Sequence, residues 1–150
     1  MNPQDEVSII RTINAVGTTA DGKDWAACRP LFAGLVYLDY TSLVGGQPTS
    51  VEADQLIESW KEALNSVQAT QHMITNHQVA ITGDEATSLS YVQAFHWHPG
   101  LAGGDSWTVF GSYEHHLVKT DGVWKIVAMK LNLKRQEGNL DLLKQVASKS

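Results

Sequence analysis

The chain has 150 residues, of which 43% are hydrophobic and 18% are charged, and its formal net charge is -5. This length is typical of one domain with a sizeable core, so we expect a single soluble domain over residues 1–150. The composition is too apolar for a disordered chain, and no apolar run is long enough to span a membrane. Lys and Arg occur singly rather than in a basic stripe, which excludes nucleic acid as the expected partner.

The beginning of the chain and its single cysteine indicate a reducing compartment. Residues 1–6 are polar and acidic, without the charged and then apolar pattern of a secretory signal. Cys28 has no second cysteine to pair with. Its place on the apolar side of a short expected helix favours a buried, inert thiol over a nucleophile. We therefore expect a cytoplasmic protein.

Helices dominate the first half of the chain. Asn2 and Pro3 have the pattern of a helix cap followed by a first-turn proline, and Gly22 is expected to end this helix. Its apolar stripe is Val7, Ile10, Ile13 and Val16. A short helix over residues 24–31, a strand over residues 35–41 and a loop over residues 45–48 should follow. Thr49 and Glu52 have the spacing of a capping box that would begin a third helix, with a buried face of Leu56, Trp60, Ala63, Leu64 and Val67.

The second half of the chain has the alternating pattern of strands. We expect four of them, over residues 70–81, 85–97, 107–120 and 123–133. The pairs Gly83-Asp84 and Asp121-Gly122 indicate tight turns, so these strands should form antiparallel hairpins. A last helix from Asn139 would bury Leu140, Leu143 and Val146. Helices followed by a meander of long strands indicate an α+β fold, in which twist curls the sheet around an apolar pocket.

Histidines are the first candidates for chemistry, because imidazole titrates near neutral pH. Six are present, five of them in expected strands. Alternation places His72 with Thr70 and Ile74, and points His96 toward an apolar interior. His98 should be exposed, and at most one of the neighbours His115 and His116 can face inward. His96 and His98 alone are weak evidence for a metal, which needs three or four converging ligands, so we expect no metal site.

Four segments carry a more specific resemblance. They are residues 21–25 (DGKDW), 38–42 (LDYTS), 70–72 (TQH) and 121–125 (DGVWK). In this order they resemble scytalone dehydratase and the broader SnoaL-like group of the nuclear-transport-factor-2-like (NTF2-like) superfamily. The resemblance implies a cone-shaped, cystatin-like fold. It spans the chain from the first helix to the last strand, although the loop from His98 to Ser106 looks shorter.

The resemblance also implies a set of catalytic residues. Carried over one at a time, Asp21, Tyr40, His72 and His96 match members of the family's catalytic set. Ala20 stands where a first Tyr would be, and Tyr113 lies near an expected Asn. In the implied dehydration His72 is the acid and base, His96 holds it in orientation and Asp21 fixes a tautomer of His96.

The implied ligand is a small apolar cyclic or aromatic molecule. Tyr40 would donate to its carbonyl, and we expect Tyr113, Trp60 and Phe95 to contact it. No cofactor is needed for this chemistry, and no dinucleotide or phosphate-loop pattern is present. Assembly through the outer face of the sheet, as a trimer or dimer, is implied as well.

Other functions share this fold, and the fold alone does not decide among them. A ketosteroid-isomerase-like enzyme would need an inward carboxylate, for which Asp39 is the candidate. A steroid or bile-acid dehydratase, an epoxide hydrolase or a polyketide cyclase is a further alternative. A non-catalytic binding protein is favoured if His72 and His96 do not meet. An oligomerisation domain would have a collapsed interior.

Overall fold

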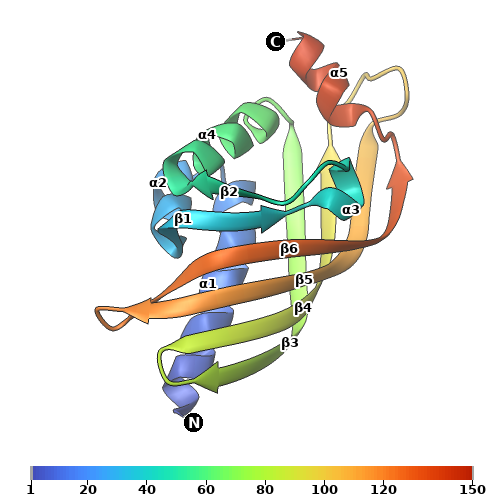
Figure 1. The fold of residues 1–150 in the computed structure, drawn as a ribbon. Coiled ribbons are helices and arrows are strands. Elements are labelled where there is room, and N and C mark those ends of the chain that lie inside the picture. Colours follow the sequence, from blue (N-terminus) through green and yellow to red (C-terminus); the bar gives the residue numbers. More distant parts are fainter. Residues whose placement is uncertain (1, 150) are drawn as a thin grey trace.

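The computed structural model describes residues 2–149, which form helices on one side of a long, curved sheet (Figure 1). The helices are α1 (Pro3–Asp21), α2 (Trp25–Cys28), the 3-10 helix η1 (Arg29–Leu31), α3 (Thr41–Val44), α4 (Ala53–Leu64) and α5 (Leu142–Lys149). The strands are β1 (Phe32–Asp39), β2 (Thr49–Glu52), β3 (Ala69–Thr82), β4 (Glu85–Trp97), β5 (Ser106–Thr120) and β6 (Val123–Gly138). The expected α+β fold class is confirmed.

The six strands form one sheet in the order β2-β1-β6-β5-β4-β3. The pairs β3–β4, β4–β5 and β5–β6 are antiparallel, as the two tight turns predict, and β1 lies parallel to β6. Figure 1 shows α1 crossing these long strands, with α4 and α5 near one end of the sheet. This arrangement leaves an interior between the helices and one face of the sheet.

Helix α1 begins as its sequence predicts. The Asn2 side chain accepts a hydrogen bond from the backbone N–H of Gln4, and Pro3 occupies the first turn. The helix ends at Asp21, with Gly22 as the cap and Lys23 in the left-handed conformation at φ 54°. The Lys23 ammonium donates to the carbonyls of Asn65 and Val67, at 2.8 and 2.6 Å. These bonds fasten the end of α1 to the loop that precedes β3.

Three local expectations were wrong. Thr49 and Glu52 do not form a capping box: they belong to β2, which pairs with β1, and Glu52 makes no side-chain cap bond to α4. Of the buried face expected for the next helix, Leu56 and Val67 are buried, but Ala63 is exposed, and α4 buries Ala53 and Ile57 as well. In the last helix Leu140 is 59% exposed while Leu142 is fully buried. The helix begins three residues later than Asn139, which changes the side chains on its buried face.

Irregular strand pairing bends the sheet. The register shifts between Thr75 and Gln78 in β3, and twice along the β5–β6 pair, where β6 has the extra residue. At one of the β5–β6 shifts a Cβ on Gly111 would lie 2.3 Å from the Asn132 carbonyl oxygen, so only glycine allows this close approach. Such bulges increase twist and curvature. The inner face of the sheet thereby becomes concave.

The core lies between this concave face and the helices. Its fully buried side chains include Ile9 and Ile13 of α1, Phe32 of β1 and Leu117 of β5. Cys28 is buried with them, as expected, and burial raises the pKa of its thiol. No helix within residues 2–149 is long and apolar enough to cross a membrane.

Candidate active site

A mostly apolar cavity of about 240 Å³ lies between the sheet and the helices. Its polar side chains are His72, His96, Tyr40, Tyr113 and His115. Three helices also line the cavity, through Leu43 and Val44 of α3, Trp60 and Leu64 of α4, and Leu143 of α5. The Val44 side chain is 74% exposed, so the cavity reaches solvent at α3. The interior is therefore open rather than collapsed, which argues against a purely structural oligomerisation domain.

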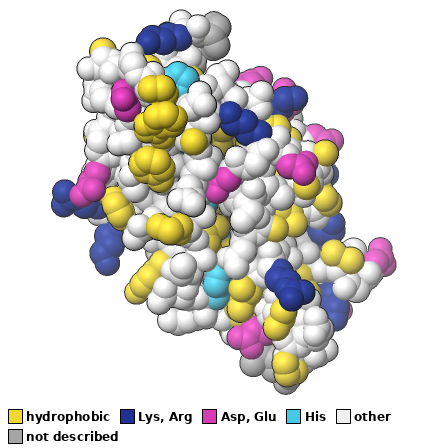
Figure 2. All heavy atoms as spheres, turned by 180° about the vertical axis from the view of Figure 1, so that it is seen from behind, with side chains coloured by type: hydrophobic (Ala, Val, Ile, Leu, Met, Phe, Trp, Pro, Cys, Tyr) yellow, Lys and Arg dark blue, Asp and Glu magenta, His cyan; other side chains and the backbone are white. Residues whose placement is uncertain are grey.

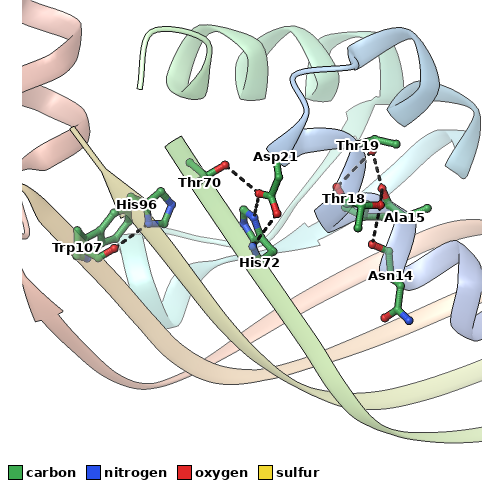
Figure 3. A network of polar contacts seen from close by, with 10 residues as sticks. Asn14, Ala15, Thr18, Thr19, Asp21, Thr70, His72, His96 and Trp107 are labelled. Carbon is green, nitrogen blue, oxygen red and sulfur yellow. Dashed lines mark hydrogen bonds and ion pairs between the residues drawn. The ribbon is translucent and has the colours of Figure 1, made fainter. Parts of the chain in front are cut away.

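Asp21 and His72 form the most highly connected pair at this cavity. Figure 3 shows Asp21, the last residue of α1, pointing at Thr70 and His72 on β3. Asp21 Oδ1 lies 2.7 Å from His72 Nδ1 and accepts the Thr70 hydroxyl at 2.9 Å. Asp21 Oδ2 accepts the backbone N–H of His72 at 2.8 Å. These contacts fix the carboxylate and the imidazole relative to each other.

The pair leaves one nitrogen of His72 available for chemistry. A carboxylate at the last residue of a helix is disfavoured by the helix dipole, so its three hydrogen bonds must compensate. Burial alone would raise the pKa of Asp21, but the hydrogen bonds and charge of His72 and the Thr70 hydroxyl lower it below its usual value. An ionised Asp21 accepts the proton on Nδ1, which leaves the lone pair on Nε2. Nε2 is therefore the basic atom of His72 at the cavity.

His96 is held in its neutral form. Its Nδ1 donates to the Trp107 carbonyl at 3.0 Å, and its ring stacks on the Trp107 indole with centroids 4.3 Å apart. Burial lowers the pKa of His96 to about 4, assisted by the charge of His72 and opposed by the Trp107 bond. The His72 and His96 rings meet edge to face at 6.1 Å. His96 thus presents an unprotonated Nε2 as a hydrogen-bond acceptor beside His72.

Two phenols lie together at the cavity wall. Burial raises the pKa of Tyr40 well above its usual value, and the charge and hydrogen bond of Tyr113 raise it further. Burial also raises the pKa of Tyr113, although its bond with Tyr40 lowers it. The Tyr40 hydroxyl lies 3.8 Å from Met129 Sδ. Both phenols stay protonated at neutral pH, so together they can supply a hydrogen bond to a ligand oxygen.

The structure brings together most of the expected residues, with three corrections. Asp21 orients His72 rather than fixing the tautomer of His96, which depends on the Trp107 carbonyl instead. Trp60 lines the cavity as expected. Phe95 does not: it is the strand neighbour of His96, so its side chain points to the opposite, outer face of the sheet, where it is 39% exposed. Asp39 accepts from the hydroxyl of Thr41 at 2.6 Å. It is not the inward carboxylate that a ketosteroid-isomerase-like enzyme needs.

The remaining histidines have other surroundings. His98 Nδ1 accepts the backbone N–H of Gln68, and His116 lies 3.4 Å from Glu85 on the outer face. Within residues 2–149, no three His, Cys, Asp or Glu side chains are grouped so that they could hold a metal ion. His115 faces inward and lines the cavity, a role that the sequence left open between it and His116.

Gly17 allows α1 to pack closely against β3. A Cβ at this position would lie 2.9 Å from the Cβ of His72. Gly17→Ala should therefore push α1 from β3, costing about 1–3 kcal/mol of unfolding free energy despite the better helix propensity of Ala. Displacement of Asp21 from His72 should also lower any turnover about tenfold or more. Urea unfolding and steady-state rates measure both effects.

Gly34→Ala is the matched control, because nothing lies within 4 Å of a Cβ placed there. It should leave stability and rate nearly unchanged. A Gly17→Ala variant that is as stable and active as the wild type would show that the contact between α1 and β3 is not tight.

The curved sheet, the covering helices and the polar residues inside an apolar cavity define a cone-shaped α+β protein with an internal pocket. The chain matches the family model of the SnoaL-like domain over residues 3–130. It belongs to this family. The resemblance inferred from the sequence segments is thereby confirmed at the level of the family.

Solved structures share the fold over most of their length. The Kfla4162 protein from Kribbella flavida is 30% identical, with 94% of this chain and 97% of that chain covered and a TM-score of 0.88. A candidate scytalone dehydratase from Novosphingobium aromaticivorans is 19% identical, with coverage of 89% and 86% and a TM-score of 0.77. A type 2 hexachlorocyclohexane dehydrochlorinase is 14% identical, with coverage of 90% and 88% and a TM-score of 0.75. The last two similarities concern the fold alone.

Proposed function

We propose that this protein is a hydro-lyase that dehydrates a small hydroxylated cyclic ketone, of the aromatic polyketide-like kind, without a cofactor. The observation that carries the proposal is the Asp21–His72 pair, which presents a basic Nε2 at the wall of an apolar cavity. Neighbouring phenols and a neutral imidazole supply the other groups that such an elimination needs.

His72 would move the proton. In a syn elimination its Nε2 takes the proton from the carbon next to the ketone, and the electron pair of that C–H bond forms the enolate. The carbon–oxygen bond then breaks, and the same proton leaves with the hydroxyl as water. The Asp21 carboxylate stabilises the imidazolium in between and holds its tautomer. The His96 Nε2 lies beside His72 and would accept a hydrogen bond from the leaving hydroxyl until it departs.

Tyr40 and Tyr113 would bind the ketone oxygen. Negative charge develops there when the proton is removed, so a donor that is already in place lowers the barrier. Their raised pKa values keep both phenols protonated as donors. Tyr113 reaches the cavity from β5 and lies beside Tyr40. This position supports Tyr113 as the replacement for the first Tyr of the family, where this chain has Ala20.

The cavity favours a compact apolar ligand. Its volume of about 240 Å³ is below the range of roughly 300–1,000 Å³ that is usual for drug-sized ligands. Trp60 and Trp107 offer aromatic surface to a ring, and no carboxylate within residues 2–149 lines this cavity. A substrate with one or two fused rings and few polar groups fits these limits better than a steroid.

The test is dehydration of 3-hydroxy-1-tetralone, whose product is 1-naphthol. Formation of the naphthol is followed by its absorbance, and catalysis above the buffer rate is the expected result. Binding of this ketol without turnover would favour the non-catalytic binding protein. An enzyme that neither turns over nor binds any member of a panel of hydroxylated tetralones would contradict the proposal.

We also propose that the protein forms a homo-oligomer through the outer face of the sheet. Exposed hydrophobic side chains on this face of β3 and β4 are Met73, Leu89, Tyr91, Phe95 and Trp97. In the view from behind, hydrophobic side chains gather in a column on one side of the molecule (Figure 2). Such a patch is typical of a protein contact.

Trp97→Glu should therefore shift the wild-type dimer or trimer toward monomer, as measured by light scattering after size exclusion. Val123→Glu is the control, because Val123 is also exposed but lies at the tip of the β5–β6 hairpin. A wild-type protein that is monomeric at micromolar concentration would overturn this assignment.

A further inference from the structure

His115 is a buried histidine whose hydrogen bonds are not made within the protein. It is 3% exposed, and neither ring nitrogen has a hydrogen-bond partner within residues 2–149. A neutral imidazole has one donor and one acceptor, and buried polar groups are rarely left unsatisfied. Burial lowers the pKa of His115 to about 3, helped by the charge of His77, so the ring is neutral.

The same region holds two more buried polar groups on the inner face of the sheet. Ser88 lies opposite His115, and Ser90 lies opposite Tyr113, across the β4–β5 pair. Neither serine hydroxyl has a hydrogen-bond partner in the described part of the chain. A strand interior of this kind could have carried Val or Ala, as it does at Val92 and Ala94. On the inner face of β4, the polar Ser88 and Ser90 thus lie next to His115 and Tyr113, whereas Val92 and Ala94 are apolar.

His115 is also next to the two phenols. Its ring centroid lies 5.3 Å from that of Tyr113, edge to face. On the other side, His115 pairs in register with Met129, whose sulfur the Tyr40 hydroxyl approaches. All four side chains line the same cavity. A ligand oxygen held by the two phenols would therefore have His115 beside it.

We propose that His115 binds a second oxygen of the ligand, a hydroxyl on the ring carbon adjacent to the one whose oxygen Tyr40 and Tyr113 hold. A hydroxyl suits the site because it can donate to the unprotonated nitrogen of a neutral imidazole or accept from the protonated one. The ligand class is accordingly an aromatic ring system with two neighbouring oxygen substituents. This inference rests on the proposed function for the placement of the first oxygen.

Binding of non-reactive naphthols by isothermal titration calorimetry tests this inference without any need for turnover. Wild type should bind 2,3-dihydroxynaphthalene at least about tenfold more tightly than 2-naphthol, because a lost partner in a buried polar site is costly. The isomer 2,6-dihydroxynaphthalene, with its second hydroxyl at the far end, should show no such gain. In His115→Phe the gain for the 2,3 isomer should fall below about threefold, while 2-naphthol binds as before.

His116→Phe is the matched control, since the neighbouring side chain points to the outer face. It should keep the tenfold preference. Should His115→Phe fail to fold, His115→Leu and the wild-type ligand series still decide the matter.

Equal affinity of wild type for 2-naphthol and the 2,3 isomer, a preference that survives in His115→Phe, or no binding of either compound would overturn the inference. A preference without any ketol turnover would retain His115 as a binding residue while the lyase proposal fails. Turnover without the preference would retain the lyase proposal and overturn the role of His115.

Discussion

His72→Gln is expected to lower turnover of 3-hydroxy-1-tetralone by about a thousandfold or more. Gln retains a polar side chain at the cavity but cannot take up a proton, so both proton transfers lose their catalyst. A general acid or base typically contributes about a hundredfold to ten-thousandfold, and His72 is assigned both roles. Steady-state rates on the purified variant measure the loss, with circular dichroism as the check on folding.

Asp21→Asn tests the contact between Asp21 and His72, whereas His72→Gln tests the proposed base itself. Asn is nearly the same size, but its amide can donate to His72 Nδ1 and thereby move the proton to Nε2, the atom that should be free. We expect turnover to fall about a hundredfold or more with little change in KM, because the tautomer matters mainly in the transition state.

Thr70→Val is the control for the Asp21–His72 pair. It removes one hydrogen bond to Asp21 Oδ1 but leaves the His72 bonds in place, so its effect should be much smaller. A His72→Gln enzyme with near wild-type rates would remove His72 from the mechanism. An inactive Thr70→Val with an active Asp21→Asn would show that the site depends on something other than this tautomer.

Much of the sheet could be predicted because local signals and tertiary structure agree. The strand over residues 85–97 has the observed limits of β4, and the glycine-containing turns define both hairpins. Thr49 to Glu52 shows where such reasoning fails. Its four residues fit both a capping box and a β-strand, and pairing with β1, which is not a local signal, decides for the strand.

The sequence predicts which face of a strand each candidate residue occupies, but not which side chains from different elements contact each other. Alternation along a strand correctly places His96 inside, and the same rule excludes Phe95, its neighbour on the other face. The partner of Asp21 could not be obtained this way. It depends on where α1 crosses β3, and the absence of a side chain at Gly17 permits that close crossing. Spacing along the sequence contains no measure of that crossing.

The folded protein should lose stability steadily as the pH falls from about 6.5 to 4. The pKa values of His96 and His115 are about 4 and about 3 in the fold, because burial disfavours their charged forms. In the unfolded chain both should titrate near 6.5. The unfolded state then binds protons that the folded state does not, and stability rises with pH wherever this holds. Stability is therefore complete above pH 6.5 and is lost below it.

The slope of the unfolding free energy against pH shows how many buried histidines take up a proton on unfolding. Two protons correspond to at most about 2.7 kcal/mol per pH unit, and one to about 1.4 kcal/mol. Urea unfolding followed by tryptophan fluorescence at pH 7, 6, 5 and 4 measures it. Burial also lowers the pKa of His77, which adds to the slope in the same direction. His115→Phe should therefore lower the slope by at most about 1.4 kcal/mol per pH unit, whereas His116→Phe, a change on the outer face, should leave it unchanged. The lowered pKa of Asp21 acts only near and below its ordinary value of about 3.9, so a flat wild-type profile between pH 6.5 and 5 would contradict the burial of two neutral histidines.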